Sequence, residues 1–404
     1  MLTHPVGLPA LKCLLSLLLT YMLLLLLCVL LHFRVIMSAE SKPMRIIFPQ
    51  SILYGWNPLS FQPANDLIKT AFYSGLIHQH LMNAVAFAFK EYSKEVIEKM
   101  QNRLLMVSGD ALASLWIPDG DLDSVLGVAI NVVCITIYDD LCDKSPEDET
   151  TIQMTVDALC RIPKLVHQHW QAHKKTVTDR EKMATEVVEE FGISGVAIVD
   201  AVSRLLSLAS IIARIKAGSD ATYDWYGEEW IREAGAWHVK RDRKIADMTE
   251  EELLSQRVLA VGARLTVSES VVFSGVSVSR ESLYHPLHKI ALDTSGVHLR
   301  LMNDIFSYDS EMGTYEASEN FVEYQRLFRT RSQNLDEALD RTIQRMNESM
   351  EEFVKAWKVM QTMDEDMKFL AMTSARHMFA HLAWAMKAPR YTRQKFVAER
   401  ILLK

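Results

Sequence analysis

The chain has 404 residues and a hydrophobic content of 49%, and this length and composition are enough for one large domain or two modest ones. Its formal net charge is −7. Its basic residues are scattered rather than clustered, which argues against a nucleic-acid-binding surface. Glycine (15) and proline (11) occur at about half their usual frequency, and this scarcity predicts long, uninterrupted helices. The five cysteines show neither zinc-ligand nor disulfide-framework spacing, which fits a reducing compartment.

An uncharged run of nineteen residues, Cys13–Leu31, lies near the start of the chain. As a helix it would span roughly 28 Å, close to the thickness of a membrane's hydrocarbon core, and it exceeds the apolar region of a typical signal peptide, about 7–15 residues. We therefore expect residues 1–36 to anchor the protein in a membrane, with the basic residues after the run placing the main domain in the cytosol. A signal peptide cleaved near Ser38 is the main alternative, and translation from Met37 would instead give a cytoplasmic protein.

From residue 37 onward the pattern predicts one domain, because no repeat, low-complexity segment or Pro/Ser-rich linker interrupts it. Apolar residues recur at helical spacing through most of this domain, and no stretch convincingly resembles a strand. We expect an all-α fold of about ten helices, with a loop at residues 218–228. The predicted helices are 66–89, 91–105, 121–138, 154–175, 182–218, 229–240, 248–273, 287–308, 334–363 and 364–387.

The apolar helix 121–138 runs into three carboxylates, Asp139, Asp140 and Asp143. Asp139 and Asp143 lie one turn apart on the same face, and Asp140 lies about 100° round from Asp139. Like charges at this spacing repel, and the helix dipole disfavours anions at a C-terminal end. A hard cation such as Mg²⁺ would relieve both penalties, since only oxygen ligands are present. The alternative is a solvated acidic helix end that continues into residues 144–150.

A second polar pattern, NDIFSYDSE, places Asn303, Ser307 and Glu311 at steps of four along one side of a helix. Amide, hydroxyl and carboxylate oxygens suit Mg²⁺, and their single formal charge leaves room for anionic phosphate oxygens around the ion. A polar stripe on an exposed helix is the alternative, although the preceding segment GVHLRLM is too apolar for free exposure. Two oxygen-rich clusters on apolar helices suggest one shared metal–diphosphate site.

These segments resemble the class I terpene synthases of the fungal and bacterial single-domain type, including trichodiene-synthase-like proteins. DDLCD matches their DDxxD motif, and NDIFSYDSE matches their NDxxSxxxE motif. Arg390 and Tyr391, which begin 87 positions after Asn303, resemble their C-terminal Arg-Tyr pair. The stretch that ends at Arg257, 46 positions before Asn303, resembles the one that carries their diphosphate-sensing arginine. A second register would make Arg264 the sensor.

The resemblance implies one catalytic domain over residues 37–404, a helical bundle around a central cavity. It also implies three Mg²⁺ ions and a prenyl diphosphate substrate, with farnesyl diphosphate as the expected one. Arg257, Arg390 and Tyr391 would bind the diphosphate, and its departure would leave a carbocation that cyclises to a sesquiterpene. The implied metal ligands are Asp139, Asp140, Asp143, Asn303, Ser307 and Glu311.

The chain departs from the family pattern at Met312, where a basic residue is frequent, and at Gly262, which comes one position later than expected after the sensor. A trans-prenyltransferase is the alternative enzyme, although Asn-Ser-Glu in the second motif favours cyclisation over chain elongation. A non-catalytic, membrane-tethered helical protein is the other alternative. The sequence leaves open the product skeleton, the prenyl chain length and whether the protein is a homodimer.

A carbocation would need a dry pocket with apolar and aromatic walls. His377 and His381 lie one turn apart, but no third ligand accompanies them, so we expect them to pack or to lie on the surface rather than to bind zinc. The aromatic candidates for the pocket, each with core packing as its default role, are Phe72, Trp116, Tyr138, Phe273, Phe306 and Trp384.

Overall fold

The computed structural model describes residues 44–49, 63, 65–107, 109–144, 148–173, 179–192, 195–240, 248–312, 319–330, 333–388, 391 and 401–403. At a few of these positions, Asp143 and Arg257 among them, only the backbone is described. All described residues fall within one compact unit, whereas the predicted anchor, the predicted boundary at residue 37 and Arg390 lie outside them.

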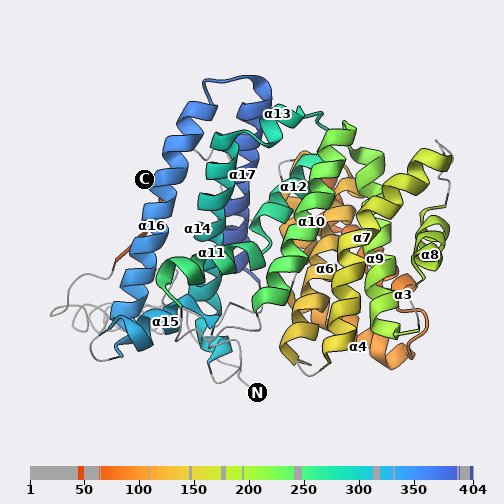
Figure 1. Ribbon diagram of the computed structural model, residues 1–404, viewed down its shortest axis with the longest axis horizontal. Helices are drawn as coiled ribbons and strands as arrows, with labels where there is room; N and C mark the ends of the chain where they lie inside the picture. Colours follow the sequence, from red (N-terminus) through yellow and green to blue (C-terminus); the bar gives the residue numbers. More distant parts are fainter. Residues whose placement is uncertain are drawn as a thin grey trace, which may run out of the picture. The chain divides into compact units, whose positions relative to one another are not determined.

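Sixteen helices make up most of the described chain, so the predicted all-α class is confirmed (Figure 1). The expected number of about ten was too low. The helices are α2 (Asp66–Tyr73), α3 (Leu76–Ala88), α4 (Lys94–Val107), α5 (Gly109–Trp116), α6 (Leu122–Lys144), α7 (Glu149–His173), α8 (Arg180–Phe191), α9 (Ala197–Lys216), α10 (Asp220–Lys240), α11 (Glu250–Ala260), α12 (Ala263–Phe273), α13 (Arg280–Leu283), α14 (Pro286–Glu311), α15 (Phe321–Phe328), α16 (Leu335–Met360) and α17 (Glu365–Ala385).

Three glycines with positive φ divide helices that the periodicity predicts as continuous. Gly75 (φ 74°) separates α2 from α3, Gly192 (φ 69°) ends α8, and Gly262 (φ 72°) separates α11 from α12. Glycine adopts this left-handed conformation without the steric cost that a side chain would add. The short helices α5, α13 and α15 were also missed, because four to eight residues carry too little periodicity to be recognised.

The prediction of a loop at residues 218–228 was wrong, because α10 begins at Asp220. The Ser219 hydroxyl accepts a hydrogen bond from the backbone N–H of Thr222 at 3.2 Å, which caps the start of this helix. The aromatic residues that follow fill the core instead of marking a loop. The buried ones are Tyr223, Trp225, Tyr226 and Trp230.

Helix α12 is central to the arrangement of the two predicted motifs. Every residue of α12 except Arg264 is buried, as expected for a helix surrounded by others. It contacts α6, α9 and α10 on one side and α14 and α17 on the other (Figure 1). Helix α14 in turn packs along α16 and α17. The helices that carry the two polar motifs, α6 and α14, therefore both border α12.

Two short strands, which the sequence did not predict, pair in parallel. Strand β1 (Ile46–Phe48) and strand β2 (Ile401–Leu403) pair with Ile46 opposite Ile401. The side chain of Asn347 on α16 holds β1: its oxygen accepts from Ile47 N–H at 3.0 Å, and its amide donates to Arg45 O at 2.8 Å. Three-residue strands are too short to produce a recognisable alternation of polar and apolar residues.

Within the described part of the chain, one helical span, Leu122–Leu141, is long and apolar enough to cross a membrane by length and composition. Of its most apolar window, 67% is buried inside the protein. This burial matches the prediction of a core helix ahead of the acidic motif.

Candidate active site

The second motif occupies the last turns of α14, which ends at Glu311. Ser307 and Glu311 are buried, and Asn303 is half-buried. The alternative of a polar stripe on an exposed helix face is therefore wrong. The motif lies where its oxygens are withdrawn from bulk water, which strengthens their interaction with any bound cation.

The structure brings Asn303 together with a second predicted site residue, Tyr391. The Asn303 side-chain amide donates a hydrogen bond to the Tyr391 hydroxyl at 3.0 Å. Because the amide nitrogen is used in this way, the carbonyl oxygen Oδ1 is the atom left to bind a cation. Tyr391 is itself buried, and the rings of Trp384 and Phe306 contact it edge-on at centroid distances of 5.2 and 6.1 Å.

Ser307 and Glu311 are also oriented by hydrogen bonds. The Ser307 hydroxyl donates to the Asn303 backbone carbonyl at 2.8 Å, so its oxygen lone pairs remain for a cation. The Asn320 side-chain amide donates to Glu311 Oε2 at 2.9 Å and to the carbonyl of Asp304 at 2.8 Å. Asn320 was missed, although Asn ahead of a short helix is a capping signal: its oxygen accepts from Val322 N–H at 2.9 Å.

The second residue of the motif, Asp304, has a structural role. Its carboxylate forms an ion pair with Arg300 one turn earlier and accepts from the backbone N–H of Phe321 at 3.0 Å. Both Asp304 and Arg300 are buried. Asp304 therefore ties α14 to the start of α15, while its neighbours on the other face supply the predicted cation ligands.

The acidic motif lies inside α6, which continues to Lys144 instead of ending near residue 138. Asp139 and Asp140 are half-buried, which excludes a fully solvated acidic end at these two positions. The charge of Asp139 acts on Glu233 of α10, so this carboxylate faces the interior side of α10. The Asp143 side chain lies outside the described atoms.

Among the described residues, no group of three or more His, Cys, Asp and Glu side chains is arranged to hold a metal ion. Two of the three predicted ligands on α14 are an amide and a hydroxyl, which fall outside that set of residue types. His377 and His381 lie buried on α17, and His377 Nε2 is 2.7 Å from the Ser270 hydroxyl. This contact agrees with the expected packing role of His377.

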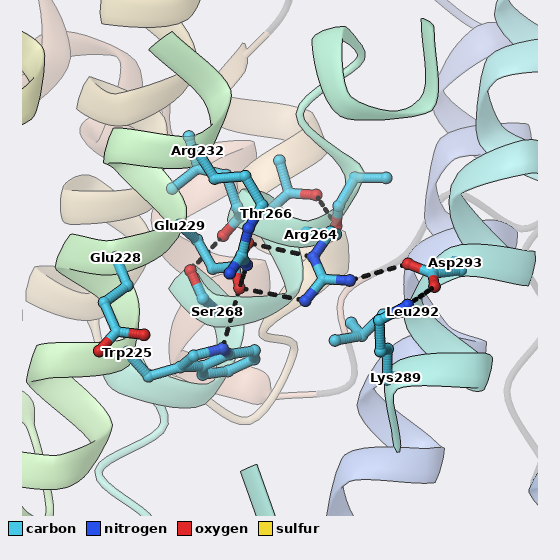
Figure 2. Close-up of polar contacts among 12 residues, drawn as sticks. Trp225, Glu228, Glu229, Arg232, Arg264, Thr266, Ser268, Lys289, Leu292 and Asp293 are labelled. Atoms are coloured by element: carbon cyan, nitrogen blue, oxygen red, sulfur yellow. Dashed lines mark hydrogen bonds and ion pairs between the residues drawn. The ribbon is translucent and has the colours of Figure 1, made fainter. Parts of the chain in front are cut away.

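Arg264, the alternative diphosphate sensor, already has two carboxylate partners (Figure 2). Its guanidinium donates to Glu229 Oε2 at 3.2 Å and to Asp293 Oδ1 at 2.8 Å. Burial by itself lowers the pKa of Arg264, but the charges of Glu229 and Asp293 outweigh burial and raise it. Arg264 thus joins α12 to α10 and α14.

Glu229 is the buried centre of this network, with 1% of its side chain exposed. Besides Arg264 it accepts a hydrogen bond from Trp225 Nε1 at 3.0 Å and pairs with Arg232 (Figure 2). A buried carboxylate with two guanidinium partners is compensated for its lost hydration.

Arg257, the preferred sensor, lies in the second half of α11, and its side chain is outside the described atoms. Helix α11 starts with a capping box in which Thr249 and Glu252 exchange hydrogen bonds. It ends two residues before Gly262, whose left-handed backbone turns the chain into α12. The periodicity predicted a single helix over residues 248–273, and Gly262 divides it into α11 and α12.

The aromatic residues predicted for a pocket are mostly buried against neighbours. Phe273 lies against Gly127, where an added Cβ would come within 2.2 Å of its ring. Trp116 packs on His377 with a centroid distance of 4.7 Å. Phe306 and Trp384 flank Tyr391 and so border the second motif.

Comparison with known proteins places these features in one family. Residues 131–352, more than half of the chain, match the family described as terpene synthase family 2, C-terminal metal binding. The fold is similar to that of a-eudesmol synthase (16% identity, TM-score 0.59, 81% of this chain and 97% of that one). It is also similar to hedycaryol synthase in complex with HEPES, with 16% identity and a TM-score of 0.55 over 80% of this chain and 94% of that one. A third similar fold is that of germacradien-4-ol synthase from Streptomyces citricolor, with 16% identity and a TM-score of 0.51 over 82% of this chain and 95% of that one. No curated protein sequence matches the chain.

Proposed function

This chain belongs to terpene synthase family 2 and is a terpene cyclase, and on that basis we propose that it converts farnesyl diphosphate into a cyclic sesquiterpene and diphosphate. The observation that supports this most directly is the hydrogen bond between Asn303 and Tyr391. It connects the predicted metal-binding motif to the predicted Arg-Tyr pair, which are far apart in sequence and need to act on one substrate.

The described side chains fit magnesium. Asn303 Oδ1, Ser307 Oγ and the Glu311 carboxylate are hard oxygen donors on one side of α14, and hydrogen bonds to Tyr391, Asn303 O and Asn320 fix their positions. We propose that they hold magnesium on this side, with Asp139 on α6 as the ligand on the other and Asp140 and Asp143 supporting it. When bound, three magnesium ions would neutralise the charge that develops on the diphosphate as it leaves.

The arginines act on the same leaving group. Arg257 and Arg390 would donate charge-assisted hydrogen bonds to the diphosphate oxygens. Tyr391 would couple this contact to Asn303, because its hydroxyl accepts the Asn303 amide. Arg264 is assigned a structural role instead, since Glu229 and Asp293 occupy its guanidinium.

The test is product analysis with purified full-length protein. Incubation with Mg²⁺ and geranyl, farnesyl or geranylgeranyl diphosphate, followed by gas chromatography, should give cyclic C15 products from the farnesyl substrate and none after chelation by EDTA. Asp139→Ala and Asn303→Ala should each abolish them. Chain lengthening with added isopentenyl diphosphate, without hydrocarbon release, would show a prenyltransferase, and no product from any substrate would support the non-catalytic alternative.

The hydrophobic segment at residues 13–31 needs its own test. We propose that it attaches the cyclase to a membrane. The full chain should then sediment with membranes after cell fractionation, whereas a chain that starts at Met37 should remain in the supernatant with equal activity. Recovery of the full chain in the supernatant would contradict this proposal.

A further inference from the structure

Two acidic side chains are buried in the interior between α6, α10 and α12, and no described cation acts on either of them. Glu269 of α12 has 0% of its surface exposed, and Glu233 of α10 has 4%. Within the described residues neither carboxylate oxygen of Glu269 has a hydrogen-bond partner, and neither does Glu233 Oε1. A buried polar group without a partner costs free energy, so such a group in a folded protein calls for an explanation.

No positively charged side chain among the described residues acts on Glu269. The polar groups described around it are Asn131 and Cys134 on α6 and Tyr226 and Glu233 on α10. Helix α17, packed against α12, contributes His377, which bonds the neighbouring Ser270. Burial raises the pKa of Glu269 well above its usual range, and Asn131 only partly opposes this. Burial in this position therefore favours the neutral carboxylic acid form of Glu269 over the charged carboxylate.

Glu229 provides an internal comparison. It is buried like Glu269 and lies one turn before Glu233 on the same helix, yet two arginines and a tryptophan satisfy it. The same core therefore satisfies one buried carboxylate with two cations, whereas no described cation compensates the other. This difference favours a role in chemistry for Glu269 over a role in holding the fold.

The helices place Glu269 at a defined depth below the predicted metal site. Three residues near the site lie at one level, at about the same height along their helices: Asp139, Glu233 and Gly262. The charge of Asp139 acts on Glu233, and a Cβ added at Gly262 would lie 3.4 Å from Glu233 Oε1. Glu269 follows Gly262 by seven residues, which returns it to the same face of α12 about 10 Å deeper.

The other two helices confirm this second level. Tyr226 precedes Glu233 by seven residues on α10, and Asn131 precedes Asp139 by eight on α6, so both are also about 10–12 Å deeper. The Asn131 amide donates to the Tyr226 hydroxyl at 3.1 Å, Asn131 acts on Glu269, and the charge of Glu269 acts on Tyr226. A substrate whose diphosphate lies at the metal motifs would extend its isoprenoid chain to this level.

We propose that Glu269 is the acid–base residue that first protonates and then deprotonates the isoprenoid during cyclisation. This proposal rests on the proposed function. The first ring closure loses a proton to the released diphosphate and gives a neutral cyclic alkene. The Glu269 O–H bond then breaks, and its proton forms a new C–H bond at one alkene carbon, leaving a carbocation at the other. The carboxylate afterwards takes a proton from an adjacent carbon, whose C–H electron pair becomes the new double bond.

The experiment follows solvent deuterium into the product. Wild-type enzyme equilibrated in D₂O and supplied with Mg²⁺ and farnesyl diphosphate should release a terpene with one deuterium, detected by mass spectrometry. Glu269→Gln keeps the size of the side chain but cannot deliver this proton. It should still consume the substrate while the deuterated product falls by about 10²–10⁴-fold and an unlabelled cyclic alkene accumulates. Glu229→Gln, the matched control, should leave the labelling of the product unchanged.

The outcomes separate this proposal from the proposed function. A wild-type terpene without deuterium overturns the role of Glu269 and leaves the cyclase assignment intact, whereas no terpene from wild type overturns the cyclase assignment. Full labelling by Glu269→Gln also overturns the role of Glu269. If circular dichroism shows that Glu269→Gln is unfolded, Glu269→Asp decides: slower labelling supports the proposal, and an unchanged rate contradicts it.

Discussion

The amide of Asn303 donates to the hydroxyl of Tyr391, a residue 88 positions later in the chain, at 3.0 Å. This bond fixes which atom of the Asn303 amide is left for a cation. It also ties the end of α14 to the segment that carries the Arg-Tyr pair. A metal ligand whose orientation is fixed before the ion binds does not have to be ordered by the ion.

Tyr391→Phe should weaken the response to magnesium. The variant loses the hydroxyl but keeps the ring contacts with Trp384 and Phe306. Loss of an outer partner of a metal ligand typically costs about 10–100-fold in metal affinity or activity, and we expect that loss in kcat/KM measured at limiting Mg²⁺. The control is Tyr324→Phe, which removes a buried hydroxyl bonded to Met248 O at 3.3 Å. An unchanged magnesium requirement in Tyr391→Phe would show that Asn303 does not depend on this bond.

Asn320→Asp should impair magnesium binding through Glu311, the last residue of the second motif. An aspartate still accepts from Val322 N–H and caps α15, but it no longer donates to Glu311 and adds a second negative charge beside it. We expect the Mg²⁺ concentration for half-maximal activity to rise by about 10-fold or more. Asn334→Asp, the same change at the cap of α16, should leave it unaltered. Equal magnesium curves for the two variants would contradict the orienting role of Asn320.

The two arginine candidates should separate into one functional and one structural residue. Arg264→Gln removes a partner of the buried Glu229, and breaking such a pair costs about 3–5 kcal/mol of stability, here partly offset by Arg232. Arg257→Gln should instead abolish turnover and leave the melting temperature nearly unchanged. Thermal denaturation and product formation, measured on both variants, check this assignment. The reverse pattern would make Arg264 the sensor.

His298 should make the stability of the protein depend on pH. Burial lowers the pKa of His298 to about 4, whereas an unfolded histidine takes up its proton near pH 6.5. As pH falls from about 6.5 to 4, the unfolded state binds this proton and the folded state does not, so His298 reduces stability by about 1.4 kcal/mol per pH unit.

A difference measurement isolates this effect, because the raised pKa values of Glu233 and Glu269 give slopes of opposite sign. Urea unfolding of wild type and His298→Gln at pH 7, 6 and 5 should show the stability of wild type relative to the variant decreasing with each step. Parallel curves would mean that the folded protein protonates His298 as readily as the unfolded chain.

Asn347→Ala should loosen β1 without affecting the helices. The variant loses two hydrogen bonds to the backbone of residues 45 and 47, which together contribute about 1–3 kcal/mol. Hydrogen exchange of the β1 amides should accelerate accordingly. Gln344→Ala, one turn earlier on α16 and bonded only to Glu348 among the described residues, should leave that exchange unchanged. Equal exchange rates in both variants would show that the Asn347 hydrogen bonds do not stabilise β1.

The sequence predicted those parts of the site that carry a local pattern. Helices α6 and α14 combine a long apolar run with polar residues at helical spacing, and both motifs lie on them as expected. The family resemblance likewise indicated a glycine after the sensor segment, although the helical periodicity ran through Gly262 without a break. These features depend on residues close together in the chain.

The parts that were missed depend on contacts between distant residues. Nothing near Glu269 in the sequence shows that Asn131 and Tyr226 lie beside it, or that none of the arginine side chains that the structure describes compensates it. Similarly, Arg257 and Arg264 look alike as candidates until Glu229 and Asp293 are seen to engage Arg264. Strand β1 required its partner strand and Asn347, neither of which is nearby in the sequence.

The pairing of β1 with β2 has a consequence for biosynthesis. Ile46 and Ile401 are 355 positions apart, so a ribosome must synthesise every described helix before β1 can meet its partner. Until then β1 depends on its described helical partners. These are α16, whose Asn347 bonds it, and the rings of His298 on α14 and Phe379 on α17, which contact Phe48; all of them emerge long after β1. The nascent chain must therefore keep Ile46 and Phe48, both fully buried at the end, from associating with other apolar surfaces throughout translation. A premature stop shortly before residue 401 would leave the helices complete and the edge of β1 unpaired, a ready site for aggregation.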